Sequence, residues 1–78
     1  GEPSAQYNIA TSYMTDEWGE EKDFEKAAFW FMCAYQNRKS SKSTIDASKK
    51  CLDSLAKYVN LNSVKERIVQ NYPEYLNL

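Results

Sequence analysis

Apolar side chains recur along the chain at intervals of three and four residues, the spacing that places them on one face of a helix. The first helix is expected over residues 4–15. Its apolar stripe consists of Ala5, Ile9, Ala10 and Tyr13. Pro3 and Ser4 suit a helix start, because proline lacks the N–H group that a first turn leaves unpaired and because serine can cap.

The second expected helix, over residues 24–37, is apolar on almost every side. A run of nine apolar residues extends from Ala27 to Tyr35, and Asp23 stands where a capping residue is needed. A helix that is apolar all round usually packs on more than one side. We therefore expect one partner helix before it and another after it.

Two further helices are expected in the second half of the chain. The third, over residues 44–59, follows two candidate caps, Ser41 and Ser43. Its stripe consists of Ile45, Ser48, Leu52, Leu55 and Val59. The fourth, over residues 64–71, ends before Pro73, because proline cannot continue a helix. The tail that follows keeps three apolar side chains that could pack back as a lid: Tyr75, Leu76 and Leu78.

The first two helices carry a specific residue pattern in addition to their periodicity. It reads Ala5-x-Tyr7-x-Ile9-Ala10-x-x-Tyr13, then Gly19, then Asp23-x-x-Lys26-Ala27-x-x-Trp30-Phe31-x-x-Ala34. This pattern resembles a Sel-one-like repeat, a branch of the tetratricopeptide-like helical repeats. Plain tetratricopeptide repeats share part of the first helix but have a shorter loop, so the loop length favours the Sel-one-like branch.

The resemblance implies an all-α fold of two consecutive antiparallel helical hairpins, stacked as an α–α superhelix. The hairpins would span residues 4–37 and 44–72 of a single domain, 1–78, with a tail at 73–78. The second hairpin matches the pattern only loosely and is expected to be a degenerate or capping unit. Because a stable array usually needs three or more repeats, we expect either a fragment of a larger scaffold or a compact domain closed by its last helix and tail.

The resemblance also implies where a partner would bind. In tetratricopeptide-like stacks the first helix of each pair lines a concave groove. Carried onto this chain, the groove positions are Tyr7, Thr11, Met14, Thr15, Lys49, Asp53 and Lys57. Met14 would offer an adaptable apolar contact, and the two lysines could hold an acidic peptide. Solvated lysines are the plain alternative for both.

Composition narrows the possible chemistry. The chain has 78 residues, enough for one small core, and contains no histidine and only two cysteines. The lack of imidazole removes histidine general bases, Ser-His triads and mixed Cys/His zinc sites. Two cysteines cannot close a structural zinc site unless carboxylates join them. We therefore expect no enzymatic activity, no cofactor, no metal site and no small-molecule substrate.

Charge is distributed unevenly although the net charge is only −1. Residues 1–25 sum to −6 and residues 26–78 to +5. The acidic cluster consists of Asp16, Glu17, Glu20, Glu21, Asp23 and Glu25. It is interpreted as a solvated loop beside a helix start, with a loose cation site as the alternative. The basic residues Arg38, Lys39, Lys42, Lys49 and Lys50 are interpreted as a polar connection and a solvent-facing helix surface, with phosphate contact as the alternative.

The two cysteines give an indication of whether the protein is located in a reducing or an oxidising compartment. Cys33 lies in the apolar run and Cys51 beside the third helix's stripe, so both are expected to behave as small buried hydrophobes. A bridge between the second and third helices is the alternative. No signal peptide is visible, and the nine-residue apolar run is too short to span a bilayer, which takes about 20 residues. We expect no membrane span and a reducing, cytoplasmic location.

Together these observations predict a non-catalytic protein–protein interaction or adaptor module that binds a protein or peptide partner. The alternative is a structural cap or self-association domain, including a homo-oligomer, in which the acidic loop of one copy meets the basic stretch of another. Nucleic-acid binding through residues 38–50 is a weaker alternative, because no aromatic residue stands among those bases to stack on a nucleotide.

Overall fold

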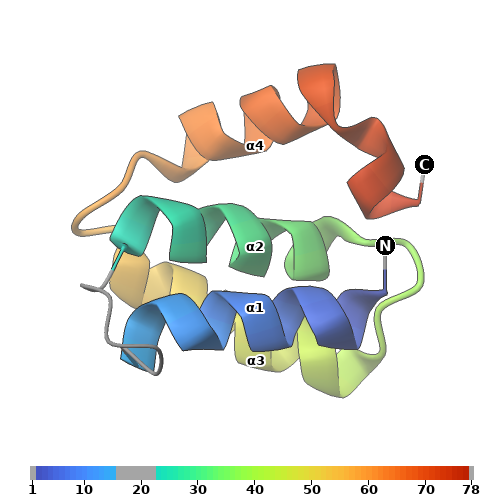
Figure 1. Cartoon of the computed structure of the whole chain (residues 1–78), viewed down its shortest axis with the longest axis horizontal. Helices are drawn as coiled ribbons and strands as arrows, with labels where there is room; N and C mark the ends of the chain where they lie inside the picture. The colour runs from blue at the N-terminus through green and yellow to red at the C-terminus, as the bar shows by residue number, and fades with distance from the viewer. Residues whose placement is uncertain (1, 16–22, 78) are drawn as a thin grey trace.

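A computed structural model of the chain describes residues 2–15 and 23–77. These residues form four α-helices and one short 3₁₀ helix (Figure 1). The elements are α1 (Pro3–Thr15), α2 (Phe24–Gln36), α3 (Lys42–Leu55), α4 (Leu61–Asn71) and η1 (Pro73–Leu76). All regular structure in the described residues is helical, which confirms the all-α prediction.

Side-chain caps explain where three of the helices begin. The side chain of Asp23 accepts from the N–H of Lys26 at 3.0 Å, as the sequence indicated for α2. Ser41 caps α3 by accepting from the Thr44 N–H at 3.3 Å. Each such cap satisfies a donor that the first helical turn leaves unpaired, and is worth about 1 kcal/mol.

The bounds of α3 and α4 differ from the expected ones. Because Ser41 rather than Ser43 caps α3, that helix begins at Lys42, and it ends at Leu55 rather than at residue 59. α4 begins at Leu61, three residues before the expected start, because Asn60 supplies its cap. The Asn60 side chain accepts from the Ser63 N–H at 3.2 Å. α4 ends at Asn71, two residues before Pro73, as predicted.

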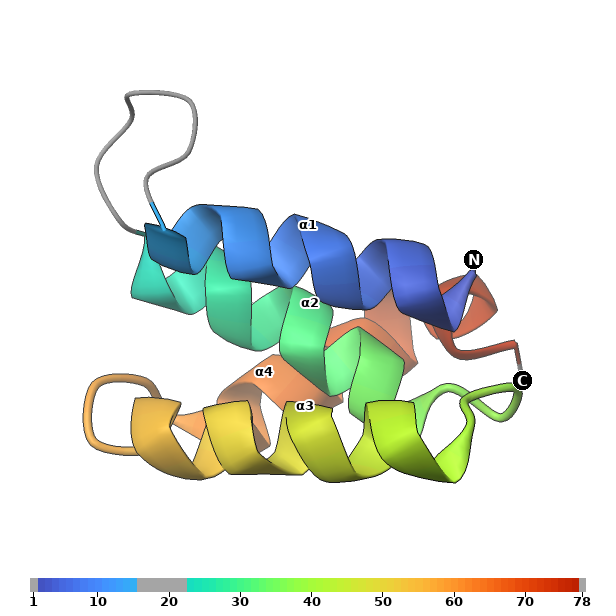
Figure 2. The same cartoon turned by 90° about the horizontal axis from the view of Figure 1, so that it is seen from below.

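α2 occupies the centre of the fold. It packs against α1, α3 and α4, and consecutive helices run in opposite directions (Figures 1 and 2). In Figure 1 α4 lies on the opposite side of α2 from α1, and in Figure 2 α2 is seen between α1 and α3. Within the described residues, α3 and α4 each pack on α2 rather than extensively on each other. α2 therefore packs on the helix before it and on the helix after it in the sequence, as expected, while the stacked superhelix stays a prediction.

The core forms where these helices meet α2. Its central side chain is Phe31, which is fully buried, as are the small residues Ala10, Ala27 and Ala34 that let paired helices approach closely. The remaining core residues are Ala28, Met32, Cys33, Leu52, Leu55, Val64, Ile68 and Leu76. Burying one large apolar side chain stabilises the fold by about 1.5–3 kcal/mol. The apolar middle of α2 thus supplies the common surface on which the other helices pack.

The C-terminal tail packs back onto the helices. η1 contacts both α4 and α2. Leu76 is buried in the core, and Tyr75 is half-buried against it. The expectation of a lid is confirmed for these two residues, whereas Leu78 lies outside the described residues.

We find no helix among the described residues that combines the length and the apolar character required to traverse a lipid bilayer.

Candidate partner-binding surfaces

Several side chains at the predicted groove positions on α1 make contacts inside the protein. The Tyr7 ring is half-buried and meets Phe31 edge-on, with 5.5 Å between ring centroids. Met14 is half-buried and packs against the core. The Thr11 hydroxyl donates to the backbone carbonyl of Tyr7 at 2.9 Å. Thr15 is the last residue of α1, and its side chain lies outside the described part of the chain.

The predicted positions in the second half of the chain are open to solvent. Lys49, Asp53 and Lys57 are all exposed. Lys49 and Asp53 stand four residues apart on α3 and so share one face of that helix. Lys57 follows the end of α3 at Leu55 and lies in the turn that leads to α4. Its expected place on the third helix was wrong, because that helix stops four residues earlier than its apolar stripe suggested.

The two helices of the predicted groove, α1 and α3, run in the same direction, and α2 is seen between them in Figure 2. They contact each other only to a small extent, since each packs mainly on α2. We call the surface that α1 and α3 present in Figure 2 the α1/α3 face. The predicted groove positions on its two helices are Thr11 and Met14 of α1 and Lys49 and Asp53 of α3.

A second surface, which the sequence did not reveal, lies where α4 and η1 cross α2. Four half-buried or exposed rings meet there: Phe29, Trp30, Tyr72 and Tyr75. Phe29 meets Tyr72 edge-on at 5.7 Å, and Tyr72 stacks on Tyr75 at 5.2 Å. We call these four rings the aromatic seam. The all-round apolar character of α2 indicated a neighbour on this side, but which rings remain at the surface depends on the crossing of α4.

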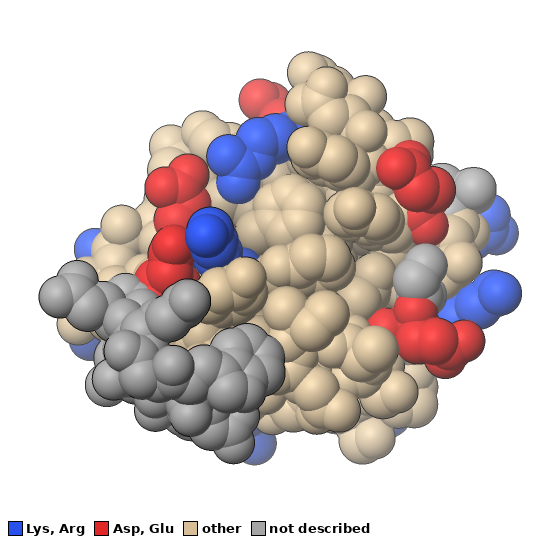
Figure 3. All heavy atoms as spheres, viewed as in Figure 1, with Lys and Arg blue, Asp and Glu red and all other residues tan. Residues whose placement is uncertain are grey.

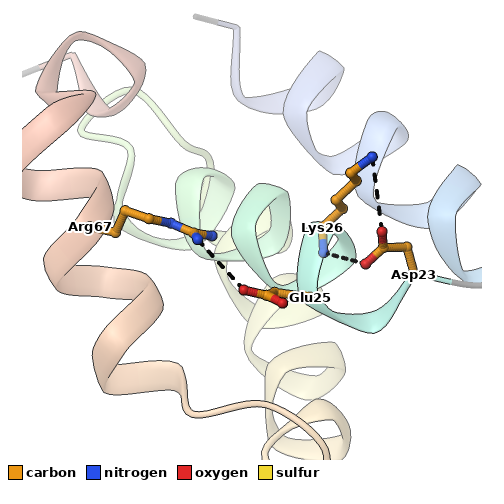
Figure 4. Close-up of polar contacts among 4 residues, drawn as sticks. All are labelled: Asp23, Glu25, Lys26 and Arg67. Atoms are coloured by element: carbon orange, nitrogen blue, oxygen red, sulfur yellow. Dashed lines mark hydrogen bonds and ion pairs between the residues drawn. The ribbon is translucent and has the colours of Figure 1, made fainter.

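Two ion pairs border the aromatic seam (Figure 4). The Arg67 guanidinium on α4 lies 3.5 Å from the Glu25 carboxylate on α2, and its Cζ lies 5.5 Å from the centre of the Phe29 ring. The Lys26 ammonium lies 4.0 Å from the Asp23 carboxylate. Pairs as exposed as these contribute at most about 1 kcal/mol each. The Glu25–Arg67 pair joins α4 to α2, whereas the Lys26–Asp23 pair lies at the start of α2.

A groove of about 440 Å³ opens beside these groups, between α1, α2 and α4. Its lining combines aromatic and charged side chains: Tyr13, Asp23, Glu25, Lys26, Phe29, Trp30, Arg67 and Tyr72. A second hollow of about 380 Å³ adjoins it beyond the Glu25–Arg67 pair. On this face of the molecule, uncharged surface lies between two groups of charged side chains (Figure 3). The groove is thus lined by aromatic rings together with two acidic and two basic side chains.

Neither cysteine is suited to act as a nucleophile near neutral pH. Cys33 is fully buried, and burial raises the pKa of its thiol to about 12. Burial also raises the pKa of the half-buried Cys51 thiol. Both thiols are free, so no bridge joins them. Cys33 is buried as expected, whereas Cys51 is only half-buried. The thiolate that nucleophilic attack needs is therefore disfavoured at both positions.

The two charge clusters are only partly described. Asp16, Glu17, Glu20 and Glu21 lie outside the described residues. Of the remaining acids, Asp23 caps α2 and Glu25 pairs with Arg67. The basic residues Arg38, Lys39, Lys42, Lys49 and Lys50 are all exposed, as expected for solvated positions. In residues 2–15 and 23–77, His, Cys, Asp and Glu form no group of three or more that could hold a metal ion.

Comparison with known protein families, with curated proteins and with solved structures gives no match for this chain. The resemblance to Sel-one-like repeats therefore stays a prediction that depends on the residues quoted above.

Proposed function

We propose that this chain is a non-catalytic protein-interaction module that binds a segment of a partner protein across the α1/α3 face. The observation that carries this proposal is that α1 and α3 run in the same direction with α2 between them (Figure 2), with Lys49 and Asp53 of α3 exposed. Within the described residues, neither of these two charges is engaged in an ion pair. They are therefore available to a partner without loss of an internal contact.

The chemistry of this face favours a peptide with both an acidic and an apolar group. Lys49 on α3, together with Lys57 in the turn that follows α3, would attract a carboxylate. Electrostatic attraction of this kind mainly raises the rate of association. Met14 is flexible and polarizable, so it can adapt to apolar side chains of different shapes. Tyr7 contributes less than its position suggests, because its ring is already packed on Phe31.

The stacked α–α superhelix belongs to the same proposal. It is supported by the common direction in which α1 and α3 run, which the first helices of successive repeats would share. The limited contact between α3 and α4 is the feature that fits least, because the two helices of a repeat normally pack closely. Further copies of the Tyr7-to-Ala34 pattern in the flanking sequence of the parent chain would support an array.

The α1/α3 proposal can be tested with a displayed library of random peptides. Peptides enriched on the full chain should shift NMR signals along α1 and α3 and should bind more weakly to a Lys49→Glu/Lys57→Glu variant. Lys65→Glu is the matched control, because Lys65 is an exposed lysine on α4. Binding that leaves the signals of α1 and α3 unmoved, or that is insensitive to the double variant, would contradict the proposal.

A self-association domain is the second candidate, and two exposed rings favour it. Tyr58 is 67% exposed and Tyr72 is 38% exposed. Sedimentation of the chain at low and high salt separates the two candidates. A dimer that persists at high salt would indicate association through the rings, whereas one that dissociates as salt rises would indicate charge-driven association, since salt screens exposed charges. A monomer at both salt concentrations would remove this candidate.

A further inference from the structure

The C-terminal segment occupies a site built by three other parts of the chain. Its Tyr75 ring stacks on Trp30 of α2, with 5.5 Å between centroids and 25° between the ring planes. The neighbouring Leu76 is only 3% exposed. An aromatic side chain on a flat ring and a leucine in a closed pocket form a two-point anchor. Adjacent anchors of this kind are common where proteins bind short peptides.

The backbone of the segment is bound as well as its side chains. The Gln6 side-chain amide on α1 donates to the Tyr75 carbonyl at 2.6 Å, and the Asn37 amide donates to the same oxygen at 3.3 Å. The backbone N–H of Arg38 donates to the next carbonyl, that of Leu76, at 2.9 Å. Two successive carbonyls of the tail are therefore bound by groups from the first half of the chain.

The donors are held in place by contacts of their own. Gln6 and Asn37 are both 3% exposed, and the Asn37 amide also donates to Gln6 Oε1 at 3.0 Å. Asn37 Oδ1 accepts from the backbone N–H of Lys39 at 2.9 Å. This arrangement orients the amide hydrogens toward the position of the tail carbonyls. Buried donors of this kind are costly to leave unpaired, so the site favours an occupant that supplies carbonyl oxygens.

The segment is joined to α4 by a residue that is not helical. Tyr72, with φ −136° and ψ 45°, separates η1 from α4. The tail is held by the Tyr75 ring, by Leu76 and by polar contacts, among them one from the Asn77 side-chain amide to Asn37 Oδ1 at 2.8 Å. Parts of a protein can open at a lower free energy than the whole fold does, and hydrogen exchange measures whether this segment does so.

We infer that Gln6, Asn37, the Arg38 N–H and Trp30 form a peptide-binding site that the chain's own tail occupies in cis. Its trans ligand is a partner segment with an aromatic–leucine pair after a turn-forming proline, the chemistry of the Pro73–Leu76 segment. The partner would displace the tail and pair its own two carbonyls with the freed donors. This site is separate from the α1/α3 face, so either assignment can fail without the other.

Hydrogen exchange of the unmodified chain tests whether the tail opens by itself. The Arg38 amide is protected by the Leu76 carbonyl, whereas the Cys33 amide lies within the buried part of α2. If the tail opens locally, the Arg38 amide should exchange at least about tenfold faster than the Cys33 amide. Equal protection of the two amides would show that the tail leaves only on global unfolding, and it would overturn the inference.

Peptide binding to a tail variant tests the site itself. Leu76→Asp places a charge in the leucine pocket and should release the tail. Glu74→Ala is the matched control, because Glu74 is exposed on the same segment. A capped peptide of residues 72–77 should then bind the Leu76→Asp chain saturably and shift the Gln6 and Asn37 side-chain amide signals. Binding to the Glu74→Ala chain should be at least about tenfold weaker, because the tethered tail competes at a high effective concentration.

The leucine pocket supplies the last control. The same peptide with alanine at the position of Leu76 should show no saturable binding. The assignment is wrong if the unaltered peptide does not bind a folded Leu76→Asp chain. It is also wrong if the peptide binds but leaves the signals of Gln6, Asn37 and Trp30 unchanged. If Leu76→Asp unfolds the chain, the exchange experiment on the unmodified protein decides the question.

Discussion

Tyr75 lies flat on Trp30, so a ring from the end of the chain covers a ring of the central helix. The same Tyr75 ring also stacks on Tyr72, with 5.2 Å between centroids and 11° between planes. Aromatic pairs contribute about 0.5–1.5 kcal/mol beyond the area they bury. This stack therefore links α2 to the C-terminal segment through side chains that are only partly buried.

Removal of this ring should weaken the fold measurably. We expect Tyr75→Ala to lower the free energy of unfolding by about 1–3 kcal/mol, because it loses ring burial and the contacts with the rings of Phe29, Trp30 and Tyr72. Urea denaturation followed by circular dichroism measures the change. The exposed neighbour Glu74 provides the control, and Glu74→Ala should change stability by less than about 0.5 kcal/mol. Equal effects of the two substitutions would show that the stack contributes nothing.

Ser48 should be replaceable with a gain in stability. It is fully buried on α3, and its hydroxyl oxygen has no hydrogen-bond partner in the described structure. A buried hydroxyl without a partner costs about 1–3 kcal/mol, so Ser48→Ala should raise the free energy of unfolding by about 1 kcal/mol or more. Ser54→Ala, at an exposed position of the same helix, corrects for the higher helix propensity of alanine. A loss of stability at Ser48 relative to Ser54 would contradict this expectation.

The buried thiol of Cys33 should make stability depend on pH in the alkaline range. Its pKa is raised from 9.0 to about 12 in the folded chain. Between those values the unfolded state loses the proton while the folded state keeps it, so stability should be unaffected below pH 9 and should fall as pH rises further. Denaturation midpoints measured from pH 7 to 11 should decline more steeply for the unmodified chain than for Cys33→Ala. Parallel profiles would show that the thiol is not protected.

The Glu25–Arg67 pair should couple α2 to α4 only weakly. Both side chains are largely exposed, so a double-mutant cycle with Glu25→Gln and Arg67→Gln should give a coupling energy of about 0.2–1 kcal/mol. The coupling should shrink as salt is added. Arg67→Ala should cost more than the coupling energy, because it also removes the contact with the Phe29 ring. A coupling that is large and insensitive to salt would mean that the pair is better shielded than its exposure indicates.

The first half of the fold was predictable because its signals are local. Asp23 indicates the start of α2, and the run of apolar residues after it indicates that this helix has neighbours on more than one side. Both features depend on residues adjacent in sequence. The bounds of α1 and α2 therefore differ from the expected bounds by a single residue each.

The second half was harder to predict because several residues could serve as caps. Ser41 competes with Ser43 as the cap of α3, and the choice between the two serines depends on backbone geometry rather than on residue type. The hydrogen bonds of Gln6 and Asn37 form with a segment that is distant in the sequence and packs back onto them, so no local sequence pattern predicts them. The same holds for the aromatic seam, whose surface rings are selected by the path of α4.

The central position of α2 has a consequence for how the chain can be divided. α3 and α4 rest on α2 and share little surface with each other, so a fragment that begins at Lys42 would lack the support that both helices need. Such a fragment should not be an autonomous folding unit. The polypeptide should instead melt in one cooperative transition, because neither half has a complete core without the other.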